Sequence, residues 1–299
     1  MIIILGATGF IGQNLLHSMI GAKDVSLRGN DWKDSFNEAN VLINLVGKAH
    51  DHKGTATEAD YYHVNVDLVK DVFEAFKQSS AKLLIHISSL AALEEFESDI
   101  PLSEKDICNP VSWYGKSKRT AEEWLLNQDL PDNKKLIILR PPMVHGPGDK
   151  GNLGLLYKLI SKGIPYPLSA FDNKRSFISI DNFCFFINQI IQNPDKLESG
   201  IYHIADDQTV STKEIIEIIK RDTGRRTINL SLPKFIVNGI AKFGDIIPIP
   251  LNTKRLKKMT SDLLISNQKI KNALGIEKLP LTATEGLVKT IRSFNADKN

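Results

Sequence analysis

Gly6-Ala7-Thr8-Gly9-Phe10-Ile11-Gly12 is the stretch of sequence that decides the fold. It follows the apolar run Ile2–Leu5 directly and leads into a predicted helix over Gln13–Ile20, so it lies between a buried strand and a helix. Glycine lets the backbone turn tightly and come close to a pyrophosphate, and a helix N-terminus offers free N–H groups to phosphates. This context favours a dinucleotide-binding turn over the alternative, a tight strand–helix connection without a ligand.

Further short apolar runs recur downstream, at Val41–Val46, Leu83–Ile87 and Leu136–Leu139. The stretches that lead into the last two runs have helical periodicity, and Glu58–Gln78 places a stripe of apolar residues on one face: Ala59, Tyr62, Val66, Val69, Phe73 and Phe76. Strands that alternate with helices form parallel sheets, and unbroken apolar runs indicate burial on both faces. We therefore expect an α/β fold, a doubly wound parallel sheet with helices on either side.

The second strand is expected at about residues 24–28, and the segment between it and the next strand is too short for a full crossover helix and strand. The sheet is therefore expected to be trimmed at this edge. From Gly146 onward the composition changes, and short segments are interrupted by Gly and Pro, as in GPGDKGN at 146–152 and IPYPL at 164–168. A smaller α/β C-terminal substrate lobe is expected to start there.

The predicted boundaries are discontinuous: 1–146 plus about 174–204 for the dinucleotide-binding domain, and about 147–173 plus 205–299 for the substrate lobe. Ser211 and Glu214 form a capping box for a helix through Ile215–Lys220, so the lobe is folded.

Composition excludes several classes of protein. Hydrophobic residues make up 42% and charged residues 24% of the 299-residue chain, which is typical of a globular protein, and a net charge of +3 gives no whole-protein field for nucleic acid. Cys108 and Cys184 lie far apart, which predicts a reducing compartment, and we expect a cytoplasmic protein. The apolar stretch at 232–251 contains charges and prolines that prevent it from spanning a bilayer.

A metal site is not predicted. His50-Asp51-His52 has metal-binding residue types, but the two histidines would point to opposite sides of an extended segment, and no third ligand is evident.

Tyr114-Gly115-Lys116-Ser117-Lys118 stands at the start of a predicted helix that runs to about Asn127. Tyr114 and Lys118 are four residues apart and share one helix face. A phenol titrates at about pH 10, so it becomes a base near neutrality only when a neighbouring cation favours its ionised form, and Lys118 supplies that cation. The same spacing also occurs where a ring packs on the core beside a surface lysine.

Two serines end the Leu83–Ile87 strand, where ligands of doubly wound sheets bind. A hydroxyl at this position can hydrogen-bond a reacting oxygen beside Tyr114, and we prefer Ser89 over Ser88 for this role. The alternative is that both serines cap the strand and start a loop.

The choice between NAD and NADP stays open, with NAD slightly preferred. A carboxylate at the end of the second strand would bind the adenosine ribose, but the predicted strand ends at Arg28, with Asp31 three residues later. Arg28 is suited either to pairing with a 2′-phosphate or to a solvated surface position.

Seven segments together resemble the extended short-chain dehydrogenase/reductase superfamily, and within it the nucleoside-diphosphate-sugar epimerase/dehydratase family, over nearly the whole chain. They occur in family order: GATGFIG (6–12), NLVG (44–47), VNVD (64–67), HISSLAA (86–92), YGKSK (114–118), LRPPMVHGPG (139–148) and RSFISIDNF (175–183). The resemblance implies a Rossmann fold and is closest to UDP-glucose and UDP-N-acetylglucosamine 4-epimerases of the bacterial polysaccharide-synthesis type. It also suggests a homodimer.

The resemblance assigns roles to individual residues. The implied catalytic residues are Ser89, Tyr114 and Lys118. The implied cofactor contacts are Gly6, Thr8, Gly9, Phe10, Ile11, Gly12, Arg28, Leu45, Val46, Gly47, Asn65, Tyr114 and Lys118. The implied substrate contacts are Ser89, Asn152, Arg175 and, as a speculative choice from the basic run at 254–258, Arg255.

Alternatives to these substrate contacts remain. Arg175 and Asn152 suit an anionic diphosphate ligand, since an arginine fork and amide donors bind phosphate. A solvent-facing Arg175 is the alternative, and a solvated helix face is the simpler explanation of the basic run.

The reaction implied by the resemblance is 4-epimerisation of a UDP-hexose or UDP-N-acetylhexosamine with NAD or NADP through a transient 4-keto sugar. A reductase of a 4-keto-6-deoxy sugar nucleotide is the alternative, and a non-catalytic nucleotide-binding protein is a second one. Many sugar epimerases carry asparagine near Met143, so the exact hexose does not transfer. A dehydratase is disfavoured because Leu90 and Ala91 follow Ser89 where such enzymes have an Asp-Glu pair.

Overall fold

The computed structural model describes residues 1–29, 31–49, 55–149, 151–163, 171–224, 232–247 and 252–296. Within them, six parallel strands form a sheet in the order β2-β1-β3-β4-β5-β8. The strands are β1 (Ile2–Leu5), β2 (Ala22–Val25), β3 (Val41–Asn44), β4 (Leu83–Ile87), β5 (Lys135–Arg140) and β8 (Gly200–His203). The strand order reverses between β1 and β3, which is where doubly wound sheets bind ligands beyond the carboxyl ends of their strands.

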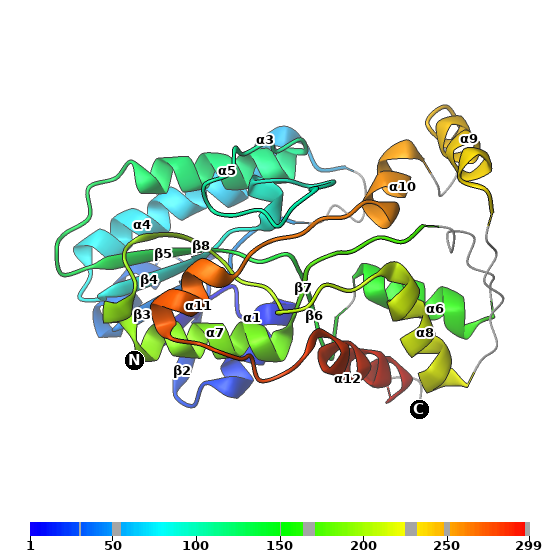
Figure 1. Ribbon diagram of the computed structural model, residues 1–299. Helices are drawn as coiled ribbons and strands as arrows, with labels where there is room; N and C mark the ends of the chain where they lie inside the picture. Colours follow the sequence, from blue (N-terminus) through cyan, green and yellow to red (C-terminus); the bar gives the residue numbers. More distant parts are fainter. Residues whose placement is uncertain are drawn as a thin grey trace.

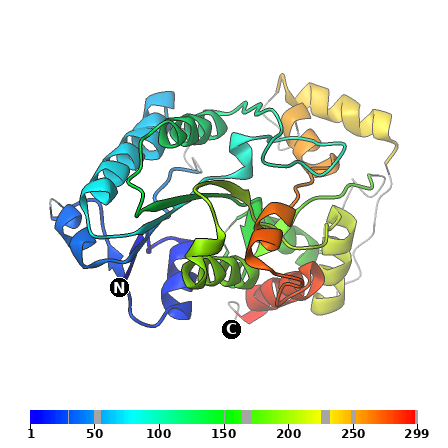
Figure 2. The same ribbon diagram turned by 60° about the vertical axis from the view of Figure 1, so that its left-hand side comes forward.

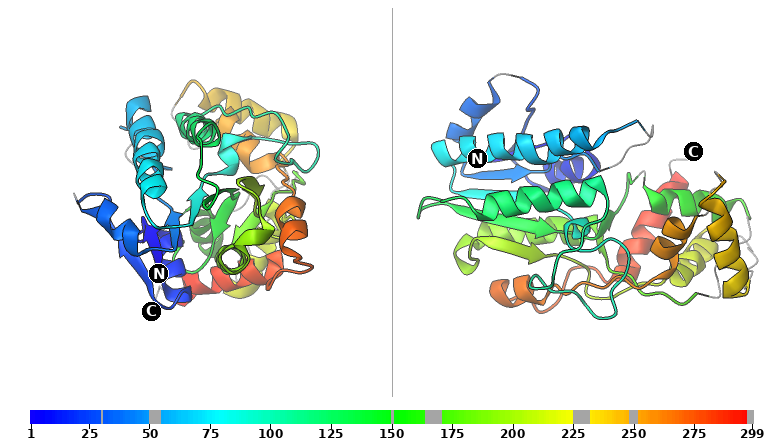
Figure 3. Two further views of the ribbon diagram at one scale, coloured as in Figure 1. Left: turned by 90° about the vertical axis from the view of Figure 1, so that its left-hand side faces the viewer. Right: turned by 90° about the horizontal axis from the view of Figure 1, so that it is seen from above.

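Helices cover both faces of this sheet (Figures 1 and 3). One layer contains α1 (Phe10–Ser18), α7 (Ile180–Gln192) and α11 (Gln268–Leu274), and the other contains α4 (Leu68–Gln78) and α5 (Trp113–Leu126). Successive residues of a strand point to opposite faces of the sheet. In β1, Ile4 packs against the layer with α1 and α7, and Ile3 packs against the layer with α4 and α5. The unbroken apolar runs of the sequence therefore reflect burial on both faces, and the predicted doubly wound sheet is confirmed.

The edge strand lies earlier in the sequence than predicted. Helix α1 ends at Ser18, Gly21 turns the chain with φ of +82°, and β2 then pairs with β1 from Ala22 to Val25. The predicted strand over 24–28 was therefore wrong in position, because the register with β1 ends where Val25 meets Leu5. The predicted trimming is correct: only the short α2 (Trp32–Ser35) and the 3-10 turn η1 (Phe36–Glu38) are described between β2 and β3, and β2 forms the sheet edge.

The predicted helix over 58–78 contains a π-helical turn. It consists of α3 (Glu58–Tyr62), the π turn η2 (His63–Asp67) and α4, and the wider turn shifts the phase of the helix faces. Tyr61 is buried and Ala59 is exposed, contrary to the predicted stripe, whereas the stripe holds from Val66 onward.

A second lobe lies beyond the carboxyl ends of the sheet strands (Figures 1 and 2). Two short parallel strands, β6 (Met143–His145) and β7 (Phe177–Ser179), lie at its junction with the sheet. The lobe contains α6 (Asn152–Ser161), α8 (Thr212–Thr223), α9 (Lys234–Gly244), α10 (Thr253–Thr260) and α12 (Ala283–Ala296), and these share a core of their own. The capping box of Ser211 and Glu214 is present as predicted.

The chain leaves the sheet after β5, forms part of the lobe, and returns through α7, the 3-10 turn η4 (Pro194–Lys196) and β8. The exact domain boundaries stay a prediction. No helix in the described ranges is long and apolar enough to cross a bilayer.

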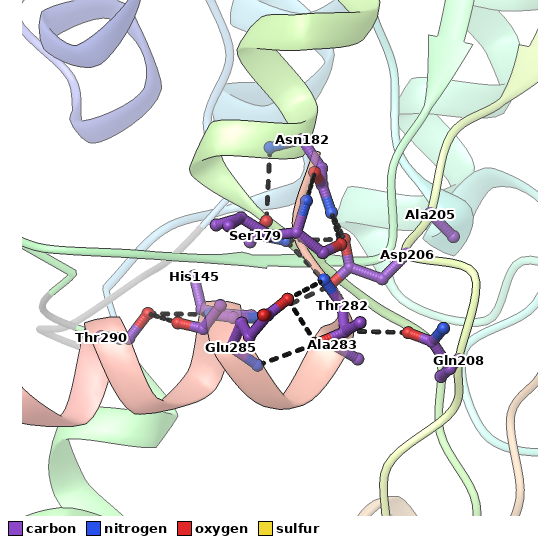
Figure 4. Close-up of polar contacts among 12 residues, drawn as sticks. His145, Ser179, Asn182, Ala205, Asp206, Gln208, Thr282, Ala283, Glu285 and Thr290 are labelled. Atoms are coloured by element: carbon purple, nitrogen blue, oxygen red, sulfur yellow. Dashed lines mark hydrogen bonds and ion pairs between the residues drawn. The ribbon is translucent and has the colours of Figure 1, made fainter. Parts of the chain in front are cut away.

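A buried polar network joins the two lobes (Figure 4). Asp206, after β8, accepts hydrogen bonds from the Ser179 backbone N–H at 3.2 Å and from Asn182 Nδ2 at 2.7 Å. His145 at the end of β6 contacts Thr290 of α12, Nδ1 to Oγ1, at 2.9 Å, and its Nε2 lies 4.0 Å from Asp206 Oδ2. Burial raises the pKa of Asp206 to about 6, because the hydrogen bonds only partly offset desolvation of the charged carboxylate.

This shift gives a prediction for stability against pH. A carboxyl group whose folded-state pKa is raised favours the folded state at low pH and loses that contribution as pH rises from about 4 to about 6. Asp206→Asn keeps an acceptor for Ser179 and Asn182 but cannot ionise. The unfolding free energy of the variant relative to the natural chain should therefore rise by about 2 kcal/mol between pH 4 and pH 7. Urea unfolding of both proteins across this range measures the difference, and a flat difference would contradict the buried ionisation.

Candidate active site

Backbone contacts around the glycine-rich turn leave no room for side chains. Gly6 has φ of +82°, and a Cβ placed there would lie 3.1 Å from the Val46 backbone nitrogen. A Cβ at Gly12 would lie 2.4 Å from the Ala7 Cα, so the first turn of α1 meets the chain directly after β1. Gly9 is the N-cap residue of α1, and no described side chain caps this helix. The first N–H groups of α1 are thus free of a side-chain cap in the described structure, as a dinucleotide site requires.

The segment that follows β3 lies against the glycine-rich turn. Asn44 accepts a hydrogen bond from the Val46 N–H at 3.0 Å, which shapes the 44–47 segment below the glycine-rich turn. Gly47 lies against Lys118 and Asn65: a Cβ on Gly47 would be 3.0 Å from Lys118 Nζ and 3.3 Å from Asn65 Oδ1. The structure therefore brings the predicted cofactor segment 45–47 together with two further predicted residues.

Asn65 lies in the π turn η2 and is fully buried. Its Oδ1 accepts from the Lys48 N–H at 2.8 Å, while its Nδ2 donates to the Lys48 carbonyl at 3.1 Å and to Ser117 Oγ at 2.9 Å. Asn65 thereby fixes the segment after β3 to helix α5. Widened π turns often occur at functional sites, and here the turn places an amide between two site elements.

Helix α5 carries Tyr114 and Lys118 in its first two turns, and Ser112 caps it by accepting from the Gly115 N–H at 3.0 Å. The Lys118 ammonium is buried and donates to the Ile87 carbonyl at the end of β4 at 2.9 Å. Burial lowers its pKa to about 8, although Glu122 acts in the opposite direction. Lys118 is thus held as a desolvated group whose charge responds to its partners.

Tyr114 is partly exposed, and its hydroxyl contacts Ser89. Desolvation raises the pKa of the phenol, while the hydrogen bond with Ser89 lowers it. Ser89 begins the 3-10 turn η3 (Leu90–Ala92) and accepts from the Ala91 N–H at 3.2 Å. The three residues predicted from the sequence as catalytic therefore converge from the end of β4 and the start of α5.

Ser88 has a different surrounding. It is buried and donates to Glu122 Oε1 at 2.5 Å, and the same carboxylate receives two bonds from Arg140, from Nε at 2.9 Å and from Nη2 at 2.6 Å. Ser88 thus belongs to a buried ionic network behind α5, whereas Ser89 faces Tyr114. This arrangement supports the preference for Ser89.

Glu95 is a site residue that the sequence analysis missed. It is buried and accepts from the backbone N–H groups of Val111 at 3.0 Å and Ser112 at 2.6 Å. Burial acts to raise its pKa, but the hydrogen bonds from Ser112 and Val111 and the nearby Lys258 outweigh this and lower it. Its charge in turn raises the pKa of Tyr114. The Glu94-Glu95 pair shortly after Ser89 was the available signal, but only the fold brings it to the start of α5.

Arg175 reaches the same region from the extended segment directly before β7, where it forms isolated bridges with Val210 and Leu263. Its Nη1 donates to the Ser261 carbonyl at 3.1 Å and to the Phe96 carbonyl, next to Glu95, at 3.4 Å. Burial lowers its pKa to about 10, with Asp262 opposing the shift. Arg175 is therefore not the solvent-facing residue of the alternative interpretation; it is a half-buried cation bound to backbone carbonyls, which suits an anionic ligand.

Three other predicted contact residues have no described contact with Ser89, Tyr114 or Lys118. Arg28 is exposed, three residues beyond the end of β2 rather than at its last position. Asn152 is exposed at the first residue of α6, a helix without a described side-chain cap. Arg255 lies in α10, but its side chain lies outside the described residues.

The described residues contain no candidate metal site. The described part of the chain contains no group of three or more His, Cys, Asp or Glu side chains suited to a metal ion, and residues 50–52 lie outside it.

Comparison with known proteins points to one family. The profile of the family described as "NAD dependent epimerase/dehydratase family" matches residues 2–205. The chain is 28% identical to a UDP-glucose 4-epimerase of Vibrio cholerae over 98% of this chain and 95% of that protein. It is 24% identical to an N-acetyl-alpha-D-glucosaminyl-diphospho-ditrans,octacis-undecaprenol 4-epimerase of Escherichia coli O157:H7 over 78% of this chain and 75% of that protein.

Solved structures share the fold. The UDP-glucuronic acid 4-epimerase of Bacillus cereus in complex with NAD superimposes with a TM-score of 0.76 at 17% identity, covering 100% of this chain and 99% of that one. RMD of Pseudomonas aeruginosa complexed with NADPH gives a TM-score of 0.73 at 17% identity, covering 99% of both chains.

The close contacts of Gly12 give a prediction for the turn. In Gly12→Ala the new methyl group would meet backbone atoms of Gly6 and Ala7 that cannot move aside without separating α1 from β1. We expect a loss of about 1–3 kcal/mol in unfolding free energy and weaker NAD binding. Thermal unfolding and calorimetric titration with NAD measure the two effects. Gly29→Ala is the matched control, since a Cβ there meets nothing within 4 Å; equal behaviour of the two variants would refute the packing argument.

Proposed function

Since the chain belongs to the NAD-dependent epimerase/dehydratase family, we propose that it interconverts the two C4 epimers of a UDP-hexose or UDP-N-acetylhexosamine. One observation carries the proposal: Tyr114, whose pKa the Ser89 side chain lowers, shares a helix face with the buried Lys118, which adjoins Gly47 beside the glycine-rich turn. The 4-epimerase activities named for the relatives from Vibrio cholerae and Escherichia coli agree with this assignment.

The chemistry follows from these positions. When bound, NAD supplies the acceptor that takes the hydride from sugar carbon 4 and returns it. Tyr114 removes the proton of the 4-hydroxyl group as the carbonyl forms, and gives it back when the epimeric alcohol forms. Ser89 hydrogen-bonds the same sugar oxygen, and the Lys118 ammonium stabilises the ionised phenol. A transient 4-keto sugar therefore links the two epimers.

Inversion also requires the sugar to turn over while the nucleotide stays bound. Arg175 is the proposed anchor for the diphosphate, because its half-buried guanidinium donates to the carbonyl of Phe96, the residue after Glu95, whose charge acts on Tyr114. Asn152 and Arg255 remain proposed additional contacts. A firm hold on the diphosphate with a loosely held hexose allows either face of carbon 4 to be presented.

A second candidate function is favoured by Arg28. The exposed guanidinium follows the edge strand β2, and Val25 rather than a carboxylate ends that strand. A 2′-phosphate suits such an arginine. With NADPH, the same three residues would serve a one-way reduction of a 4-keto-6-deoxy sugar nucleotide. The two functions differ in stoichiometry, because epimerisation consumes no cofactor and reduction consumes one reduced cofactor per product.

Location and assembly are also proposals. Cys108 and Cys184 are free thiols in the described chain, which supports a reducing compartment such as the cytoplasm. The homodimer suggested by the family resemblance is tested by light scattering of the purified protein.

The function predicts a defined activity. Purified protein with NAD should interconvert UDP-GlcNAc and UDP-GalNAc, or UDP-glucose and UDP-galactose, without net change in the NADH absorbance. Tyr114→Phe removes one hydroxyl with little change in volume and should lower turnover by about 10²- to 10⁴-fold. Chromatography of the sugar nucleotides measures conversion. Full turnover by Tyr114→Phe would remove its assigned role, and stoichiometric NADPH consumption with a keto sugar would select the reductase.

The role of Lys118 predicts a pH effect. Without the ammonium, ionisation of Tyr114 is less favourable, so its pKa rises, and activity should appear only at higher pH. Lys118→Met should therefore move the acidic limb of the kcat profile to higher pH and lower kcat near neutrality by about 10²-fold or more. Lys116→Met is the control, because Lys116 is an exposed residue of the same helix. An unshifted profile in Lys118→Met would rule out electrostatic support of the tyrosine.

A further inference from the structure

Helix α9 has an apolar face that is exposed among the described residues. The helix buries Val237 and Ala241 in the lobe core and packs against α10, and Figures 1 and 2 show it at the outer edge of the lobe. Large apolar side chains project from the helix and the turn after it: Phe235 (75% exposed), Ile236 (39%), Ile240 (41%), Phe243 (56%), Ile246 (83%) and Ile247 (43%). We call these six residues the α9 patch. Such grouped exposure differs from single exposed apolar residues and marks an interaction surface.

A basic stripe runs beside the patch. At 3.6 residues per turn, Lys234, Asn238 and Lys242 follow one another along α9, between the buried face of the helix and its exposed apolar face. Lys234 and Lys242 are both exposed. The nearby carboxylate, Asp245, is engaged by the Thr253 N–H at 3.0 Å and the Thr253 hydroxyl at 2.5 Å. Helix α9 therefore has separate buried, apolar and basic faces.

The segment that contains α9 and α10 is strongly basic as a whole. Residues 232–260 contain six basic residues, Lys234, Lys242, Lys254, Arg255, Lys257 and Lys258, and one acidic residue, Asp245, a net charge of +5. The whole chain carries +3, so the remainder carries −2. The small total charge therefore conceals a local concentration of positive charge around the α9 patch. Part of it is paired, since Lys257 contacts Glu97 at 2.7 Å and Lys258 contacts Glu95 at 3.5 Å.

We propose that the α9 patch docks the protein on the surface of an anionic lipid bilayer. An amphipathic helix with Phe and Ile on one face and lysines beside it lies in the plane of the interface, with its apolar face among the acyl chains and its lysines at the anionic headgroups. A second copy of the chain fits this surface less well, because a two-fold contact through the patch would bring two segments of charge +5 together. The proposal does not depend on the reaction at Tyr114.

Vesicle sedimentation tests the proposal with the full-length protein. The natural chain should sediment with vesicles of phosphatidylcholine and phosphatidylglycerol, bind less to vesicles of phosphatidylcholine alone, and be released by salt. Phe235→Ser combined with Phe243→Ser should weaken binding by at least about tenfold, since two aromatic side chains no longer enter the interface. Lys234→Gln combined with Lys242→Gln should weaken binding to the anionic vesicles and reduce its dependence on salt.

Controls separate docking from loss of folding. Ile20 and Ile107 are exposed apolar residues outside the patch, and Ile20→Ser combined with Ile107→Ser should leave vesicle binding unchanged. All variants should keep the melting temperature and the turnover of a water-soluble substrate, because none of the substituted residues contacts Ser89, Tyr114 or Lys118 in the described structure.

Two outcomes would overturn the proposal. The first is that the natural chain does not sediment with the anionic vesicles, or that the double phenylalanine variant sediments as strongly as the natural chain. The second is a dimer, detected by light scattering, that this variant abolishes, since a second copy would then be the occupant of the patch.

Discussion

The site depends on a steric constraint: the backbones that leave β1 and β3 must meet without side chains between them. Gly6 lies against Val46, Gly12 against Ala7, and Gly47 against Lys118 and Asn65. Because these glycines leave no gap, α1 starts directly on the sheet and its N-terminus points at the place where phosphates bind. The same closeness lets Lys118, from a helix on the opposite face of the sheet, reach the end of β3. The glycine-rich turn and the proposed proton-transfer pair, Tyr114 and Lys118, are thus positioned by one set of contacts.

Most of the buried charged side chains near Tyr114 and Lys118 are paired or hydrogen-bonded. Glu122 pairs with Arg140 and accepts a hydrogen bond from the Ser88 hydroxyl, so the two charges are paired with each other behind α5. Glu95 is held ionised by backbone N–H groups at the start of the same helix. Lys118, in contrast, donates to a backbone carbonyl, and desolvation lowers its pKa to about 8. Among these charged groups, Lys118 is therefore the one whose charge is least fixed by a partner, and it lies four residues after Tyr114 on the same helix.

How far the sequence predicts this structure differs between its parts. The central strands were predicted well because burial on both faces leaves unbroken apolar runs, as in Leu83–Ile87. The edge strand Ala22–Val25 contains Lys23 and Asp24 and was placed too late, since a half-covered edge strand lacks such a run. The π turn at 63–67 was invisible to a periodicity of 3.6 and displaced the expected stripe. Motif residues such as Ser89 and Tyr114 converge as expected, whereas Glu95 acquires its place through a long loop that local patterns do not describe.

The return of the chain through α7 to β8 has a consequence for biosynthesis. β8 hydrogen-bonds to β5, yet residues 141–199 lie between the two strands, including β6 and β7 at the lobe junction and α6 of the lobe. A nascent chain that has emerged only as far as β5 therefore has an unpaired strand at the growing margin of its sheet, and such open margins template aggregation. The sheet closes only when about two-thirds of the polypeptide has left the ribosome. The sheet is thus completed before most of the second lobe, whose helices α8, α9, α10 and α12 all follow β8 in the chain.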